Sequence, residues 1–256
     1  MAAMLQRERI SDSVALLRFD HGPVSALDLE FLEAIRAEVA SLASERLAVV
    51  LTGTGKAFSA GVDLFRIVDG NTDYTERFLP TMIGVFDALF RYPRPLVAAV
   101  NGHAIAGGCV VACTGDYRIM AAGRGRIGVP ELLVGVPFPA IGLEIVRFAT
   151  ADRGIQNLVY TGSTMLPEDA LAAGFVDEVV AEEDLIERAS ARAEQLAAIP
   201  PATFWHTKWA LRGPVLQRAR TEGSQADAGM RRIWASTETA AAIADYIQRT
   251  IGARAR

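Results

Sequence analysis

Two short glycine-containing turns are the segments of this chain whose residue types and spacing could do chemistry. The first is 57–64, Ala-Phe-Ser-Ala-Gly-Val-Asp-Leu, and the second is 101–110, Asn-Gly-His-Ala-Ile-Ala-Gly-Gly-Cys-Val. Each is expected directly after an apolar strand, 47–52 in one case and 96–100 in the other. A strand that ends in glycines before a helix leaves backbone N–H groups without an intrahelical partner. Two such groups aimed at one oxygen would stabilise developing negative charge, which indicates an oxyanion hole for a carbonyl or thioester.

Composition limits the kinds of partner that this protein can have. The chain has 256 residues, of which 51% are hydrophobic and 22% charged, as expected for one large globular domain or one domain with an appendage. Its net charge of −4 offers no general attraction to nucleic acid or to an anionic membrane. Because no apolar run reaches the ~18 residues of a membrane span and no apolar signal core stands at the start, we expect a cytoplasmic protein.

Metal and redox chemistry are not indicated by the sequence. Cys109 and Cys113 lie four residues apart among small residues on an expected helix, so they are interpreted as buried small hydrophobes. His21, His103 and His206 are scattered and have no metal-ligand spacing. We therefore predict no metal site.

Three familiar motifs are either incomplete or stand in the wrong structural context. The segment 123–128 matches G-x-G-x-x-G, but Val129 and Pro130 follow where a helix would have to begin, so a dinucleotide site is not predicted. Lys56 has no complete phosphate-binding loop before it. Ser59 lacks the leading glycine of a nucleophile elbow and is interpreted as a turn residue.

Alternating strands and helices must position the two turns. Strands are predicted over 14–20, 48–52, 96–100, 117–121 and 175–180. Helices are predicted over 29–43, 78–90, 107–114, 141–148, 155–160, 167–173 and 183–198. This alternation predicts an α/β core.

From Pro200 onward the pattern is helical only. We therefore divide the chain into a core domain, 1–199, and a C-terminal helical segment, 200–256. The apolar residues expected to anchor this segment are Trp205, Trp209, Leu211, Ile233, Trp234, Ile243 and Ile247.

Five motifs, in order and in spacing, resemble the crotonase (enoyl-CoA hydratase/isomerase) superfamily. They are 22–27, 57–64, 101–109, 116–121 and 129–135, and the segment 161–177 extends the resemblance, so that it covers roughly residues 10 to 250. The resemblance implies a spiral of ββα units and acyl-CoA thioesters as ligands. It also implies a C-terminal helical segment used to form a homotrimer or a dimer of trimers. Coenzyme A would enter as part of the substrate, and no separate cofactor is implied.

The resemblance also assigns site residues by position. The backbone N–H groups of Val62 and Gly107 match the oxyanion donors, and Glu131 matches a catalytic glutamate of the family. The predicted substrate-binding positions are Ala60, Gly61, Val62, Asp63, Leu64, Gly107, Val110 and Phe138.

Val110 and Glu131 discriminate between reactions. Hydratases of the family carry two glutamates, and here the first position is Val110 while the second is Glu131. Hydration activates water at one carbon and delivers a proton at the next, work that two carboxylates share naturally. A double-bond shift needs only one base, and no replacement acid is evident, because Phe138 and Pro139 are apolar. The details of the second turn look closest to the Δ3,Δ2-enoyl-CoA isomerase branch.

The sequence thus predicts an enoyl-CoA isomerase with Glu131 as its proton shuttle. Two alternatives stay open: an enoyl-CoA hydratase that uses Glu131 and an ordered water, and a non-catalytic acyl-CoA binder. The segment 65–90 is expected to set acyl-chain length. Structural roles are predicted for three acids, with Asp63 capping its turn, Asp116 holding a loop and Glu144 exposed or ion-paired. Candidates for the CoA phosphates are Lys56, Arg66, Arg124 and Lys208.

Overall fold

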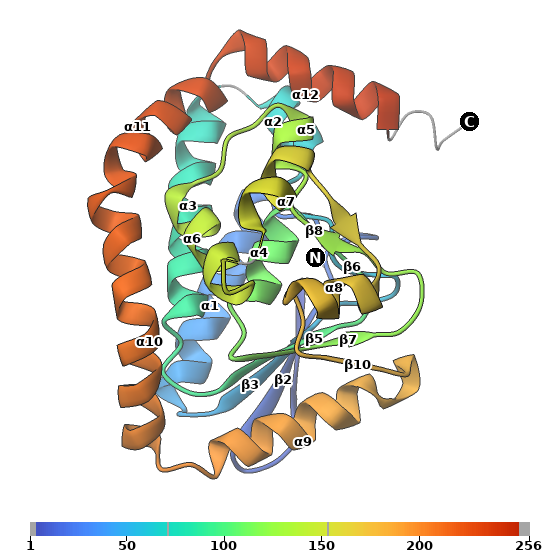
Figure 1. The fold of residues 1–256 in the computed structure, drawn as a ribbon, viewed down its shortest axis with the longest axis vertical. Coiled ribbons are helices and arrows are strands. Elements are labelled where there is room, and N and C mark those ends of the chain that lie inside the picture. Colours follow the sequence, from blue (N-terminus) through green and yellow to red (C-terminus); the bar gives the residue numbers. More distant parts are fainter. Residues whose placement is uncertain (1–3, 71, 153, 251–256) are drawn as a thin grey trace.

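A six-stranded sheet forms the centre of the molecule (Figure 1). The structure, a computed structural model, describes residues 4–70, 72–152 and 154–250. Five strands are parallel and the edge strand β1 is antiparallel, in the order β1-β2-β3-β5-β7-β10. The strands are β1 (Leu5–Arg9), β2 (Val14–Phe19), β3 (Ala48–Thr52), β5 (Leu96–Val100), β7 (Tyr117–Ala121) and β10 (Glu178–Val180). The structure confirms the predicted α/β core.

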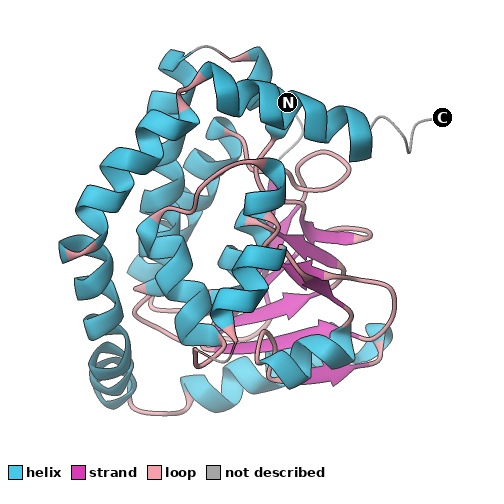
Figure 2. Cartoon of the chain, turned by 45° about the horizontal axis from the view of Figure 1, so that its top comes forward, coloured by secondary structure: helices cyan, strands magenta, loops and turns pink. Residues whose placement is uncertain are grey.

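Alternate residues of each strand pack on opposite faces of this sheet, as the period of two requires. On one face, Val14, Val50 and Val97 pack under helix α9 (Leu185–Ala197). On the other face, Leu17, Leu51 and Ala98 belong to the main hydrophobic core, which the remaining helices cover. Figure 2 shows the strands gathered together with helices arranged around them.

A second, smaller sheet was not anticipated by the sequence. It has four strands, β4 (Ala57–Ser59), β6 (His103–Ile105), β8 (Ile127–Gly128) and β9 (Thr164–Met165), in the order β4-β6-β8-β9. Segment 101–110 does begin directly after β5, and segment 57–64 follows β3 after four residues, but each segment itself contains a short strand, β4 or β6, before its turn. Strands of two or three residues are too short to show a hydrophobic period, which is why the pattern missed them.

The predicted helices of the core are present, within a few residues at most ends, and two short helices that were not predicted, α2 (Leu64–Asp69) and α5 (Glu131–Val134), join them. The others are α1 (Leu29–Ser44), α3 (Thr72–Phe90), α4 (Gly107–Cys113), α6 (Ala140–Ala149), α7 (Ile155–Thr161) and α8 (Pro167–Ala173). Helix α3 begins earlier than predicted and contains Pro80. The strand predicted over 175–180 is confined to β10, and the helix predicted from 183 begins with the 3₁₀ turn Glu182–Asp184. None of the helices within the described ranges is long and apolar enough to cross a membrane.

Three helices follow Pro200, as predicted: α10 (Pro201–Thr221), α11 (Gly223–Trp234) and α12 (Thr237–Thr250). In Figure 1, α10 runs along one side of the molecule and α12 crosses the end near α2 and α5. Several expected anchors are wrong, because Trp209, Leu211 and Ile233 are 40%, 61% and 48% exposed. Trp234 and Ile243 are buried as expected.

The buried face of α10 instead carries two cations. Asp116 accepts from Lys208 Nζ at 2.7 Å and pairs with Arg212 at 2.9 Å, and all three side chains are nearly inaccessible to solvent. Arg212 also donates to the carbonyl oxygens of Phe90 and Thr114. Asp116 further accepts from the Leu96 N–H, which supports its predicted role of holding a loop. The cluster ties α10 to the amino-terminal ends of β5 and β7.

Candidate active site

Three turns meet at one edge of the small sheet because the strands before them are parallel neighbours. β4 pairs with β6, and β6 pairs with β8, all in the parallel sense. Their carboxyl ends therefore lie at the same edge. They lead into Ala60-Gly61-Val62, Ala106-Gly107 and Val129-Pro130-Glu131 respectively. Residues that are far apart in the sequence are thus brought to one place.

The first turn presents the Val62 N–H away from its neighbouring strand segment. Val62 forms a parallel bridge with Leu27, in which Leu27 N–H donates to Gly61 O at 2.7 Å and Asp63 N–H donates to Leu27 O at 3.0 Å. In such a bridge the N–H of the middle residue points to the opposite side. The Val62 N–H is therefore directed away from Leu27.

The second turn opens helix α4 at Gly107, whose N–H belongs to the first turn of the helix and has no intrahelical acceptor. Ala106 precedes it at φ 51°, a conformation that residues with a side chain rarely adopt. Hydrogen bonds hold Ala106 there: its N–H donates to Gly128 O, and its carbonyl accepts from Val110 N–H. This strain at the start of α4 is the kind that is retained at functional sites.

The two turns touch each other at Gly61. A Cβ placed on Gly61 would lie 2.5 Å from Ile105 O and 3.2 Å from Gly107 N, and its φ is +82°. Only glycine therefore fits at this point. The contact brings the segments that carry the Val62 and Gly107 N–H groups side by side, as an oxyanion hole requires.

A cavity of about 670 Å³ opens beside these turns. Most of the predicted site residues line it, namely Ala60, Val62, Asp63, Leu64, Gly107, Val110, Glu131 and Phe138. Gly61 does not line the cavity, since it is buried where the two turns touch. The cavity is of the size typical of small-molecule sites, and its walls are mainly apolar.

Glu131 is the chemically distinctive group in this cavity. It is the first residue of α5, only 8% of its surface is exposed, and its Oε2 has no hydrogen-bond partner in the part of the chain that the structure describes. Burial raises the pKa of its carboxyl to about 8, and a hydrogen bond from its own backbone N–H offsets this only in part. A carboxyl group of this kind exchanges protons near neutral pH, as a general acid or base must.

Two acids that the sequence predicts to be structural, Asp63 and Glu144, do have structural partners. Asp63 lines the cavity, but its carboxylate accepts from Arg66 N–H and caps α2. Glu144 is buried and paired with Arg147 at 2.9 Å and Arg218 at 2.8 Å. Among the described lining residues, Glu131 is thus the acid with a buried oxygen that lacks a hydrogen-bond partner.

Val110 occupies the place where a second carboxylate would face the cavity. It lies one helical turn into α4, it is 2% exposed, and it lines the same cavity as Glu131. Phe138 and Pro139 add further apolar wall. The surroundings of Glu131 are therefore apolar, which accounts for its raised pKa.

Several lining residues were missed by sequence reasoning. His21 lines the cavity, and its Nε2 lies 2.7 Å from Asp28 Oδ2, but nothing in the sequence connects it with the turns. Trp234 and Tyr246 enter from α11 and α12. The sequence predicts Trp234 only as an apolar anchor, because its place in the cavity depends on how the C-terminal helices fold back.

None of the four residues suggested as ligands of the CoA phosphates lines the cavity. Lys56 and Arg124 are exposed and do not line the cavity, and Arg66 is paired with Glu30. Lys208 is wrong as a candidate, because it is buried against Asp116.

The two cysteines lie in the core near the site. Cys109 and Cys113 are free and buried, as interpreted. Burial raises the pKa of the Cys109 thiol well above its usual range, so that thiol is not poised to react. Over the described ranges, no group of His, Cys, Asp and Glu residues gathers in a way that could hold a metal ion.

Comparison with known proteins shows the family to which this chain belongs. The sequence profile of the enoyl-CoA hydratase/isomerase family matches residues 9–249. A putative enoyl-CoA hydratase of Thermus thermophilus is 35% identical over 164 residues, which cover 63% of this chain and 64% of that protein. The match therefore spans less than two thirds of that relative. The human protein enoyl-CoA delta isomerase 1, mitochondrial, is 31% identical over 213 residues, which cover 82% of this chain and 70% of that protein.

The fold is shared with solved structures. The crystal structure of human mitochondrial delta3-delta2-enoyl-CoA isomerase matches with a TM-score of 0.91 at 27% identity, covering 96% of this chain and 98% of that one. Together with the family profile, this similarity extends over both the core and the C-terminal helices. The chain belongs to the enoyl-CoA hydratase/isomerase family of the crotonase superfamily.

Proposed function

We propose that this protein is an enoyl-CoA isomerase that moves the double bond of a 3-enoyl-CoA to the 2-position. The observation that carries the proposal is the buried Glu131 carboxyl, which alone among the described lining acids has a buried oxygen without a partner and shares its cavity with the apolar Val110. A single proton-transferring group in an apolar cavity suits a reaction that returns the proton it removes.

The reaction would use the two turns and Glu131 together. The thioester oxygen accepts from the N–H groups of Val62 and Gly107. The Glu131 carboxylate removes a proton from C2, and the electron pair shifts into the thioester oxygen to give a dienolate. The carboxylic acid of Glu131 then returns the proton at C4, which leaves the double bond between C2 and C3. Aimed donors of this kind lower the barrier by about 3–4 kcal/mol.

Hydration is the second candidate reaction, because it requires two tasks of the Glu131 carboxyl instead of one. One carboxylate would have to activate water and also pass the proton to the neighbouring carbon. No second acid with a buried, unpartnered oxygen lines the cavity among the described residues. Val110, which lines the same cavity, also favours isomerisation, because an apolar side chain does not orient water.

The decisive experiment follows the ultraviolet absorbance of the conjugated thioester with purified protein. A 3-enoyl-CoA and a 2-enoyl-CoA are supplied separately. Rising conjugation from the 3-enoyl substrate, without loss from the 2-enoyl substrate, is expected. Loss of conjugation from the 2-enoyl substrate would identify a hydratase. Tight acyl-CoA binding with neither change would identify a non-catalytic binder.

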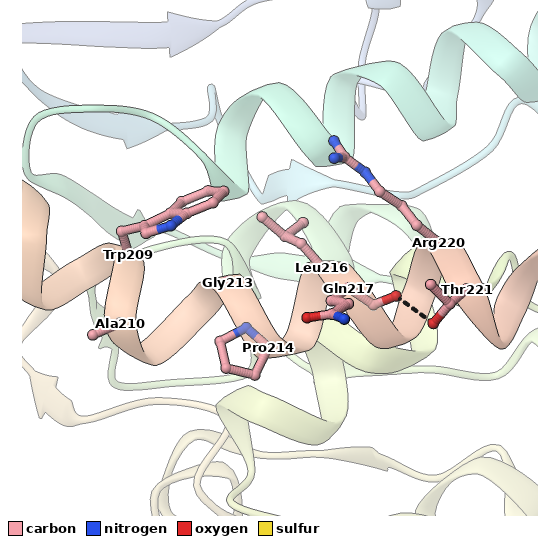
Figure 3. A pocket seen from close by; sticks show the side chains of 8 residues that line it. All are labelled: Trp209, Ala210, Gly213, Pro214, Leu216, Gln217, Arg220 and Thr221. Atoms are coloured by element: carbon pink, nitrogen blue, oxygen red, sulfur yellow. Dashed lines mark hydrogen bonds between the residues drawn. The ribbon is translucent and has the colours of Figure 1, made fainter.

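We further propose that the protein forms a homotrimer or a dimer of trimers, through the C-terminal segment. Helix α10 leaves Trp209 and Leu211 40% and 61% exposed. A shallow groove of about 490 Å³ runs along it between Trp209 and Thr221 (Figure 3). Large apolar side chains gathered on one helix are typical of a protein interface. Light scattering after size-exclusion chromatography tests this, and a monomeric mass at micromolar concentration would contradict it.

A further inference from the structure

The cavity has an exposed part and a buried part. Val24 and Phe65, which line it, are 41% and 50% exposed. Met82, Phe86 and Trp234, which also line it, are 2%, 1% and 5% exposed. A charged nucleotide-like group stays near solvent, whereas an apolar chain is stabilised by burial. An acyl-CoA would therefore lie with its CoA toward Val24 and Phe65 and its acyl tail toward the buried part.

Trp234 is held rigidly in the buried part. Its Nε1 donates to Pro137 O at 3.0 Å, in the segment that joins α5 to α6. On the same helix, Asp227 accepts from Ala140 N–H at 2.8 Å. These bonds tie α11 to the chain that follows Glu131. The preceding residue, Ile233, is 48% exposed, so it lies on the solvent side of the helix while Trp234 is buried.

The packing of α11 places Trp234 beside the other buried walls. Helix α11 contacts both α3, which carries Met82 and Phe86, and α6. The sequence predicts that the segment 65–90 sets the acyl-chain length. Three residues of this segment, Phe65, Met82 and Phe86, do line the cavity. Trp234 comes from outside this segment, and a hydrogen bond fixes the position of its indole.

We propose that Trp234 is a specificity residue that limits the length of the acyl chain, because its indole closes the buried part of the cavity. The inference rests on the proposed acyl-CoA substrate and deepens it. It does not depend on whether the reaction is isomerisation or hydration, since it concerns only where the tail ends.

The test compares wild-type protein with Trp234→Leu by calorimetric titration of hexanoyl-CoA and dodecanoyl-CoA. Both ligands are saturated and are not turned over. In an apolar pocket, one methylene changes discrimination by about 10- to 200-fold. We expect the preference for dodecanoyl-CoA over hexanoyl-CoA to rise at least about tenfold in Trp234→Leu.

Two further variants separate the size of the ring from its hydrogen bond. Trp234→Phe keeps a ring but loses the Nε1 donor, and it should retain most of the wild-type length preference. A shift as large as that of Trp234→Leu would overturn the proposal, because the tether to Pro137 would then be the cause. The matched control is Ile233→Ala on the outward face of α11, which should leave the preference unchanged.

The outcomes distinguish this inference from the proposed function. If wild-type protein binds neither ligand, the acyl-CoA assignment is wrong and this inference falls with it. If wild-type protein binds both and Trp234→Leu keeps the same preference, only the role of Trp234 is wrong. Thermal melting checks that each variant is folded. Should Trp234→Leu unfold, Trp234→Met takes its place. We then expect the preference for dodecanoyl-CoA to rise in the same direction but by less.

Discussion

Among single residues, the proposed mechanism assigns proton transfer to one carboxyl group, which is kept away from water. Glu131 is nearly inaccessible, and its Oε2 has no hydrogen-bond partner in the described part of the chain. Burial of a carboxyl oxygen without a hydrogen-bond partner is destabilising, so its presence calls for a functional reason. The purpose that fits is proton transfer, because the same burial that costs stability brings the pKa of Glu131 to about 8.

Glu131→Gln tests that role directly. The amide has nearly the same shape but cannot accept the proton from C2. We expect kcat to fall about 10²- to 10⁴-fold, while the affinity for a saturated acyl-CoA changes little. Steady-state kinetics and calorimetric titration measure the two quantities. Undiminished turnover in this variant would remove Glu131 from the mechanism.

The pH dependence of activity should follow the same group. Glu131 acts as a base only when ionised, so kcat/KM of the wild-type enzyme should rise with pH and level off above about 8. A pH–rate profile of the initial rate measures this. A profile that is flat from about pH 6 to about pH 9 would show that the carboxyl does not titrate in the free enzyme.

Stability should change with pH in the opposite direction. An unfolded glutamate loses its proton near its ordinary value of 4.5, whereas folded Glu131 keeps it up to about 8. Between these values the folded state holds a proton that the unfolded state has lost, so this group destabilises the fold increasingly as pH rises. Glu131→Gln should therefore melt at a higher temperature than wild type at about pH 8, and the difference should vanish near about pH 4, as scanning calorimetry at several pH values can check.

Among the helices and strands, the site depends on very short strands packed against the start of a helix. Helix α4 approaches β4 so closely that a Cβ on Gly108 would lie 2.3 Å from Ser59 O. Ser59 ends β4, and its Oγ donates to Ser25 O and accepts from Gly61 N–H. Ser59 is therefore a buried strand residue rather than the turn residue that the sequence indicated. Its bonds hold the first turn in place.

Gly108→Ala should disrupt this packing, while a matched glycine tolerates the same change. The added methyl would push β4 away from α4, and we expect a loss of about 1–3 kcal/mol together with weaker acyl-CoA binding. Gly84 lies within α3, and no neighbouring atom lies within 4 Å of the position that a Cβ would take there, so Gly84→Ala should stabilise by about 0.5–1 kcal/mol. Urea unfolding of both variants measures the contrast. Equal effects would mean that the contact between β4 and α4 is unimportant.

In the molecule as a whole, the C-terminal helices complete the cavity and are attached by buried charges. Trp234, Tyr246 and Thr250 line the cavity from α11 and α12. The attachment of α10 to the core runs through Asp116, which meets Lys208 and Arg212. The domain division at 199/200 stays a prediction, although α10 does begin at Pro201.

Asp116→Asn should loosen this attachment. Removing the carboxylate leaves two buried cations without their partner, which costs about 3–5 kcal/mol. Asp245→Asn is the control, since its pair with Arg249 is largely exposed and should matter by less than about 1 kcal/mol. Chemical denaturation measures both free energies of unfolding. Similar small losses in the two variants would contradict a structural role for the buried cluster.

Features that depend on local pattern could be predicted from the amino-acid sequence. Continuous apolar runs rich in valine predicted β3 and β5, because strands buried on both faces need no alternating polar positions. The motif resemblance pointed to Glu131, Val110 and the two glycine-containing turns, which the structure brings to one cavity.

Features that depend on neighbours distant in the chain came only from the folded molecule. Strands β4, β6 and β8 exist because they pair with one another, and each is too short to carry a period. The face of α10 that is buried bears Lys208 and Arg212 because Asp116 lies opposite, so hydrophobicity alone indicated the wrong face. Two further features arise only when separate segments pack together: the burial that raises the pKa of Glu131 and the place of Trp234 in the cavity. A local sequence pattern cannot predict such packing.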